Sequence, residues 1–277
     1  MPEGPPPAPA VQKLRLRYAK RGRLRFTSHR DFQRAFERAL RRSEVPMAYS
    51  AGFTPHPKVS YAGAAPTGVA SEAEYLEISV VRRCEPDELR ALLDSSLPPG
   101  LDVLEVVEAA PGNLAERLQA SVWDIRLPDV EPETARKAVE AFMAAESVEV
   151  ERMTKNGMRA FDARAAVAAL DTDAPSAASD GADGSHASDD EIDAGHQGVD
   201  GSGDRPCAIL RLVVRHTTPA VRPDDVLSGL RLVADLAPPV PAAVTRLAQG
   251  PLDTATGAVT DPLAPEHAVT STGNEEL

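Results

Sequence analysis

Residues 11–43 read VQKLRLRYAKRGRLRFTSHRDFQRAFERALRRS and contain the two periodic patterns of a mixed fold. In the VQKLRLRYA segment apolar and basic residues alternate, which is the period-two pattern of a half-buried strand. From Phe32 to Leu40 apolar residues recur at the i, i+3, i+4, i+7 and i+8 positions, on one face of a helix. The stretch therefore predicts a strand followed by an amphipathic helix over residues 28–43.

Four further elements complete a first unit. They are a strand at about 58–64, a strand at 75–82, a helix from Glu85-Pro86 to Leu97, and the strand LDVLEVVEA at 101–109. The order β-α-β-β-α-β is that of the ferredoxin-like split βαβ unit. We expect residues 11–110 to form such a unit.

The second part of the chain contains similar elements. They are the strand SVWDIRLPD, a helix at 131–145, a strand at 147–154, the stretch MRAFDAR, a short helix at 164–170, a strand at 207–216, a helix at 223–230 and the strand VTRLAQG. We interpret residues 118–250 as a second ferredoxin-like unit, interrupted by residues 171–204. The predicted fold is α+β, with two tandem ferredoxin-like units, and the similar stretches KRGRLRF and KNGMRAF suggest that the units are duplicates.

Three segments are expected to be disordered because they lack the apolar residues of a core. Residues 1–10 are rich in proline, and residues 257–277 show no periodic pattern. Residues 171–204 contain ten acidic residues, no Lys or Arg, and almost no branched aliphatic side chains. We therefore expect 171–204 to be an acidic insertion in the second unit.

Composition excludes several classes of protein. The chain has 277 residues and a formal net charge of −12, yet residues 11–60 contain 13 basic and 3 acidic residues. Two distant cysteines, Cys84 and Cys207, exclude a disulfide-stapled scaffold and a CxxC metal site. The opening MPEGPPPAPA lacks the features of a signal peptide and no apolar run could span a bilayer, so we expect a cytoplasmic protein.

The predicted helix at 28–43 is the first candidate binding surface. Arg30, Arg34, Arg38 and Arg41 project within about 80° of one another at 100° per residue, opposite the apolar face. Such a cluster is typical of proteins that bind the phosphate backbone of RNA. A solvated helix face, or contact with an acidic partner or with the chain's own insertion, would produce the same pattern.

The loop after this helix is the second candidate. It contains Tyr49, Phe53, His56 between two prolines, and Lys58. Tyr49 or Phe53 could stack on a base of single-stranded RNA, with Lys58 on a phosphate. Alternatively, Phe53 packs into the core beneath a rigid turn.

Two histidines are weak catalytic candidates. Ser28 is expected to cap the helix, with Asp31 completing a capping-box variant. His29 would then lie at a helix N-terminus, where it could act on a phosphate, and we expect His56 to converge on the same face. His29, Asp31 and His56 lack the spacing of a known metal site, and we predict neither a metal nor a cofactor.

Several of these runs, in this order, resemble the radical SAM-linked protein family, a bacterial domain of unknown function. They are GRLRF (22–26), SHRD (28–31), RALRR (38–42), GFTPHP (52–57) and SEAEY (71–75). The resemblance is close over residues 12–110 and looser through VTRLAQG. Arg30 stands where the family usually has Leu, and Ala64-Ala65-Pro66 replaces a Pro-Leu-Pro.

The resemblance implies a partner, because this domain is found fused to, or encoded beside, a radical SAM protein with a cobalamin-binding domain. The chain itself has two cysteines and lacks the three-cysteine cluster motif of a radical SAM enzyme. We therefore expect a non-catalytic accessory module that binds RNA or presents a substrate to that partner. The alternatives are a metal-independent RNA-processing enzyme that uses His29 and His56, and a subunit that contacts only proteins.

Overall fold

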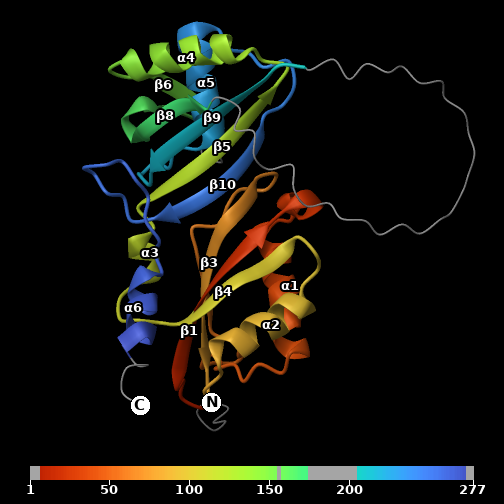
Figure 1. Cartoon of the computed structure of the whole chain (residues 1–277). Helices are drawn as coiled ribbons and strands as arrows, with labels where there is room; N and C mark the ends of the chain where they lie inside the picture. Colours follow the sequence, from red (N-terminus) through yellow and green to blue (C-terminus); the bar gives the residue numbers. More distant parts are fainter. Residues whose placement is uncertain (1–6, 155–156, 174–204, 273–277) are drawn as a thin grey trace, which may run out of the picture.

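The computed structural model describes residues 7–154, 157–173 and 205–272. These residues form a mixed α+β fold with six α-helices and an eight-stranded sheet (Figure 1). In the described part of the chain, no helix is long and apolar enough to cross a membrane.

The first half has the predicted order of elements. They are β1 (Gln12–Lys20), a 3-10 helix η1 (Gly22–Phe26), α1 (His29–Arg42), β2 (Val59–Ala62), β3 (Ala70–Val80), α2 (Pro86–Ser96) and β4 (Leu101–Glu108). The strands lie in the order β4-β1-β3-β2, and every neighbouring pair is antiparallel. The predicted helices and strands of this half are confirmed to within a few residues, except that β3 begins five residues earlier than expected.

The second half repeats this arrangement with one addition. Its elements are α3 (Leu114–Arg117), β5 (Ala120–Pro128), α4 (Pro132–Ala144), β6 (Glu149–Thr154), β7 (Gly157–Asp162), η2 (Arg164–Ala166), β8 (Val167–Asp173), β9 (Cys207–Arg215), α5 (Pro223–Ala234) and β10 (Ala243–Gly250). The strands lie in the order β10-β5-β9-β8, again antiparallel throughout. The added β6–β7 hairpin forms a separate two-stranded sheet.

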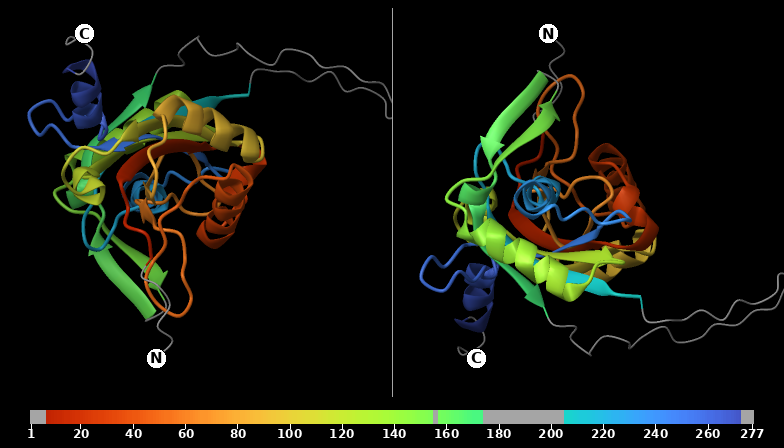
Figure 2. Two further views of the ribbon diagram at one scale, coloured as in Figure 1. Left: turned by 90° about the horizontal axis from the view of Figure 1, so that it is seen from below. Right: turned by 90° about the horizontal axis from the view of Figure 1, so that it is seen from above.

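The two halves share one sheet. Strand β3 pairs with β10 in parallel, with Ala70 opposite Thr245 and Ser71 opposite Arg246. The resulting sheet is curved, and α6 (Ala264–Thr272) lies outside the curve while α5 lies within it (Figure 2). A pairing of only a few residues joins the halves, so side chains at this junction determine how firmly they are held.

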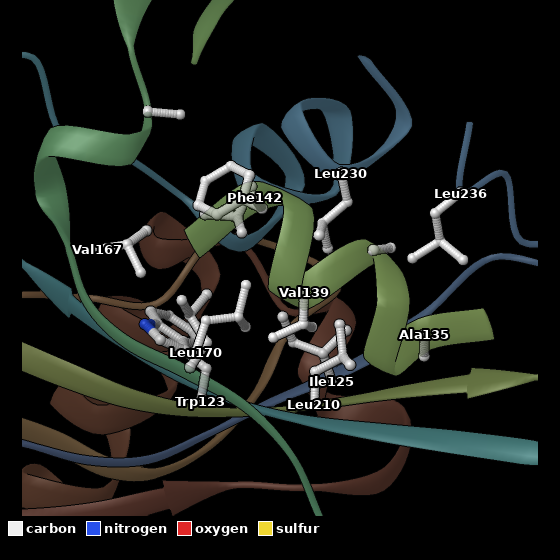
Figure 3. Packing of buried hydrophobic residues seen from close by; sticks show 14 of the residues in the cluster. Trp123, Ile125, Ala135, Val139, Phe142, Val167, Leu170, Leu210, Leu230 and Leu236 are labelled. Carbon is white, nitrogen blue, oxygen red and sulfur yellow. The ribbon is translucent and has the colours of Figure 1, made fainter. Parts of the chain in front are cut away.

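Each half has its own apolar core between its sheet and its two long helices. In the first half, Phe32 and Phe36 of α1 are buried against Leu14 and Leu16 of β1 and Leu76 of β3. In the second half, side chains of α4 point toward those of β5 and β9, as the close view shows for the residues labelled there (Figure 3). The apolar periodicity of the sequence therefore identifies the faces that the helices bury.

One short segment was assigned the wrong secondary structure. The helix predicted at 164–170 is limited to η2, and Val167–Asp173 form strand β8 beside β9. Val167 and Leu170 are both buried in the apolar core of the second half. Their spacing of three residues resembled a helix because a register shift between Val167 and Ala169 interrupts the strand alternation.

The stretch after Gly257 is ordered as far as the structure describes it, contrary to the expectation for residues 257–277. Helix α6 lies on the face of the first half opposite α1 and α2 (Figure 1). Glu266 of α6 is buried, and its carboxylate accepts hydrogen bonds from the guanidinium groups of Arg15 and Arg117. This ion cluster orders a segment whose own sequence shows little periodicity.

The acidic insertion lies almost entirely outside the described residues. Only its first three residues, Asp171 to Asp173, are described, and they belong to strand β8. The remainder of the predicted insertion, and the predicted N-terminal segment before residue 7, are not among the described residues. The stretches KRGRLRF and KNGMRAF do not occupy equivalent positions, because the first lies between β1 and α1 and the second reaches into β7 after α4.

Candidate nucleic-acid interface

Helix α1 begins as the sequence predicts. The backbone N–H of Asp31 donates to Ser28 Oγ at 3.2 Å, and the Ser28 hydroxyl donates to Asp31 Oδ2 at 2.6 Å. These bonds satisfy donors that a helix N-terminus otherwise leaves without partners. Asp31 therefore has a structural role, and the apolar face of Phe32 and Phe36 holds the helix against the sheet.

The basic side chains of α1 point away from the core. Arg30, Arg34, Arg38 and Arg41 are all exposed. Arg34 makes an exposed ion pair with Asp31 at 3.7 Å, a kind of contact that holds a side chain only weakly. No ion pair joins the other three to the described residues. The predicted row of guanidinium groups is therefore available to a ligand.

Several other basic residues of the N-terminal region are paired with carboxylates, although Arg23 and Arg25 beside α1 are exposed without an ion pair to the described residues. Arg15 is fully buried beside Glu77 and Glu266. Arg21 bonds both Glu72 and Asp102, and these carboxylates raise its pKa. The basic surface is therefore narrower than the sequence suggests, and it is centred on α1.

The loop after α1 is a closed hairpin. Ser50 and His56 pair across it, because Ser50 N donates to His56 O at 2.9 Å and His56 N donates to Ser50 Oγ at 3.2 Å. Tyr49 bridges to Pro57 in the same ladder. Phe53 lies at the tip and is 88% exposed, so it does not pack into the core. The hydrogen-bonded hairpin thus presents the ring of Phe53 to solvent.

A hollow of about 410 Å³ lies between this hairpin and the C-terminal half of α1. Its lining comprises Glu37, Leu40, Arg41, Glu44, Val45, Met47, Tyr49, Pro55, His56 and Pro57. Three residues from our prediction, Arg41, Tyr49 and His56, therefore meet in one place. Sequence reasoning missed Glu37 and Glu44. The spacing of Glu37 from Arg41 could have placed it on the same helix face, whereas Glu44 lies in the turn after α1 and has no such signal.

The two histidines do not form a pair. His29 accepts a hydrogen bond from Gln33 Nε2 at 3.0 Å, and its ring packs edge-on against Tyr61 at 5.0 Å. His56 bonds Ser50 through Nδ1 at 2.9 Å and lies beside the other end of α1. No described contact joins the two rings. The structure thus gives no support to an acid–base pair made of His29 and His56.

Tyr61 of β2 packs against His29 and Phe32 in the N-terminal part of α1. Its hydroxyl is buried and has no hydrogen-bond partner among the described residues. Burial, with a smaller effect of the nearby Glu37 carboxylate, raises its pKa. Tyr61 therefore stays protonated and contributes no charge to the surface.

Lys58 points into a different hollow. That hollow is lined by Lys13, Glu77 and Ser79 as well as by His56 and Lys58. His56 separates it from the hollow beside α1, because His56 lines both. The structure therefore places Lys58 in a different hollow from Arg41, although the two residues are close in the sequence.

Residues 13–223 match the model of the family DUF2344, described as an uncharacterized protein conserved in bacteria. This match covers more than half of the sequence. The chain belongs to the DUF2344 family. No curated protein matches the chain. The matched region of the DUF2344 chain includes α1, the hairpin and the hollow between them.

A second polar cluster of the DUF2344 chain lies at the junction of its halves. Glu74 of β3 and Arg246 of β10 form an ion pair, and they are 2% and 3% exposed. Ala65 N donates to Glu74 Oε2 at 3.0 Å, and the guanidinium of Arg246 lies over the ring of Trp123 at 5.4 Å. No local sequence pattern marks Glu74 as part of a buried pair, because its partner lies 172 residues away.

Lys20 extends this buried cluster. It is 5% exposed, and its ammonium group donates to the carbonyl oxygen of Pro66 at 3.1 Å. Burial lowers the pKa of Lys20, while the nearby Glu74 carboxylate opposes that effect. Glu74 thus faces two cationic groups, so its negative charge is needed to balance them.

Proposed function

We propose that this chain is a non-catalytic module that binds single-stranded RNA through α1 and the Ser50–His56 hairpin. The proposal rests on two observations: the exposed row of Arg30, Arg34 and Arg38 on α1, and the solvent-facing Phe53 at the tip of the hairpin that borders the C-terminal half of this helix. Exposed guanidinium groups bind phosphates, and the weak surface ion pair of Arg34 with Asp31 does not prevent this; an exposed ring stacks on bases. The combination is typical of surfaces that bind single strands.

The geometry favours this function over a solvated helix face and over an RNA-processing enzyme. If α1 presented only a solvated face, nothing would require the neighbouring hairpin, which Ser50 and His56 close, to keep the ring of Phe53 88% exposed. An enzyme would require catalytic groups in mutual contact, whereas His29 and His56 contact different residues.

Substitution of Phe53 by Ala should weaken RNA binding without loss of stability. We expect a cost of about 1–3 kcal/mol in binding if the ring stacks on a base. The melting temperature should stay within about 2 °C, because an 88% exposed ring makes few contacts. Fluorescence anisotropy with a labelled decauridine at about 50 mM salt measures the first quantity, and a thermal melt measures the second. Unchanged affinity would remove Phe53 from the interface.

We also propose that the two halves are tandem ferredoxin-like units. The strand orders β4-β1-β3-β2 and β10-β5-β9-β8 support this, because each is the order 4-1-3-2 within its own half. By the family resemblance, we propose a radical SAM protein with a cobalamin-binding domain as the partner. Copurification of the two proteins, with and without ribonuclease treatment, tests this partner and shows whether RNA is needed for the association.

A further inference from the structure

We propose that the hollow between α1 and the Ser50–His56 hairpin binds one guanine base of the bound strand. This inference rests on the proposed RNA-binding function and adds a base preference to it. The hollow measures about 410 Å³ and lies within the range of about 300–1,000 Å³ typical of small-ligand sites. It adjoins the arginine row, because Arg41 belongs to both.

Charged groups of both signs meet in this hollow without neutralising one another. Glu37 and Arg41 are one helical turn apart on α1, Glu44 lies in the turn that follows the helix, and all three line the hollow beside the hairpin. Among the described residues, no ion pair or side-chain hydrogen bond involves any of the three. Their hydrogen-bonding capacity is therefore available to a ligand.

The hairpin contributes an oriented imidazole and an aromatic ring. Ser50 occupies Nδ1 of His56 at 2.9 Å, so Nε2 is the nitrogen that can meet a ligand. Tyr49 is 41% exposed at the rim of the same hollow. The ring of Tyr49 can stack on a base, while His56 and Arg41 lie where a flanking phosphate or a base acceptor would be bound.

Guanine matches this set of groups best. One edge of the base presents two acceptors, O6 and N7, which suit the paired N–H donors of an arginine. Its Watson–Crick edge presents the N1–H and N2–H donors, which suit a carboxylate such as Glu37. Uracil and cytosine lack N7. Adenine lacks the adjacent N1–H and N2–H donors that guanine presents to a carboxylate. A carboxylate in a site for a polyanion is otherwise unfavourable, because it repels phosphates.

The test uses the full chain and three labelled decamers of uridine that differ at one central position: guanosine, inosine or uridine. We expect the guanosine decamer to bind about 5-fold or more tightly than the uridine decamer. Inosine lacks the 2-amino group and should lose most of this preference. Equal affinity for all three decamers would overturn the guanine site and leave the proposed RNA binding intact.

Substitution of Glu37 by Gln should change the affinity for the guanosine decamer in opposite directions under two explanations, a purely electrostatic effect and a specific contact of Glu37 with guanine. Removal of a negative charge strengthens binding of any RNA if electrostatics alone acts. If Glu37 binds guanine, the variant should instead bind the guanosine decamer more weakly and no longer distinguish it from inosine. Glu88→Gln, on the exposed surface of α2, is the matched control and should leave the preference unchanged. A rise in affinity for every decamer in Glu37→Gln would overturn the proposal.

A further experiment distinguishes an error in the guanine site from an error in the proposed RNA binding. If no decamer binds, the proposed RNA binding is wrong, and guanosine and inosine monophosphates are then titrated separately by calorimetry. Tighter binding of the guanosine nucleotide, lost in Glu37→Gln, would support the guanine site alone. Absence of heat from both nucleotides would overturn it.

Discussion

Replacement of Glu74 by Gln should lower the free energy of unfolding by about 3–5 kcal/mol, the usual cost of removing one partner of a buried ion pair. The substitution keeps the shape of the side chain but leaves Arg246 and Lys20 as buried cations without a compensating carboxylate. For a domain of this size the melting temperature should fall by about 6–20 °C. Urea denaturation and a thermal melt measure the two quantities.

Glu72→Gln is the matched control for this substitution. Glu72 lies two residues away on the same strand and forms its ion pair with Arg21 at the surface. Exposed pairs contribute about 0–1 kcal/mol, so the control should change stability little. If Glu74→Gln were as mild as Glu72→Gln, the charge cluster would not hold the two halves together.

A double variant would separate the ion pair from other effects of Glu74. Arg246→Gln alone should also destabilise the protein, because it leaves Glu74 buried with only Lys20 near it. Combining it with Glu74→Gln should cost less than the two single losses added together. Strict additivity would contradict a direct interaction across the junction of β3 and β10.

Replacement of Arg30, Arg34 and Arg38 by Ala should reduce the affinity for single-stranded RNA by about 100-fold at 0.1 M salt. Each lost phosphate contact removes about 0.7 from the slope of log K against log salt, so the triple variant should have a slope smaller by about 2. The loss should be similar for every sequence, because phosphate contacts do not identify bases. The side chains are exposed, so folding should be unaffected.

The control for this variant removes the same charge elsewhere. Arg126 of β5, Arg215 of β9 and Arg231 of α5 are exposed on elements of the second half, and their replacement by Ala changes the net charge equally. If binding followed net charge alone, both triple variants would lose affinity to the same extent. The proposed interface requires a much smaller loss in the control.

Local patterns predicted most of the fold, and long-range partners explain what they missed. The apolar spacing of Phe32 and Phe36 correctly indicated the buried face of α1. In contrast, nothing near Arg15 in the sequence indicates that it is buried, because its partner Glu266 lies 251 residues away. The same partner explains why the segment around α6 is ordered although its own sequence has little apolar periodicity.

The candidate site was predictable in part for the same reason. The arginine row follows from helical spacing alone, and the prolines around His56 fit the hairpin that the hydrogen bonds between Ser50 and His56 close. The hollow was not predictable, because it depends on how the hairpin folds back on α1. Glu37 and Glu44 were not among the predicted site residues, because only that fold brings them into the hollow.

The salt dependence of RNA binding by the unmodified chain tests the central proposal most directly. Anisotropy with a labelled single-stranded decamer would be measured from about 50 to 300 mM salt. The three exposed arginines predict measurable binding at 50 mM salt and a slope of log K against log salt near −2 or steeper. Absence of binding at 50 mM salt, or affinity independent of salt, would contradict it.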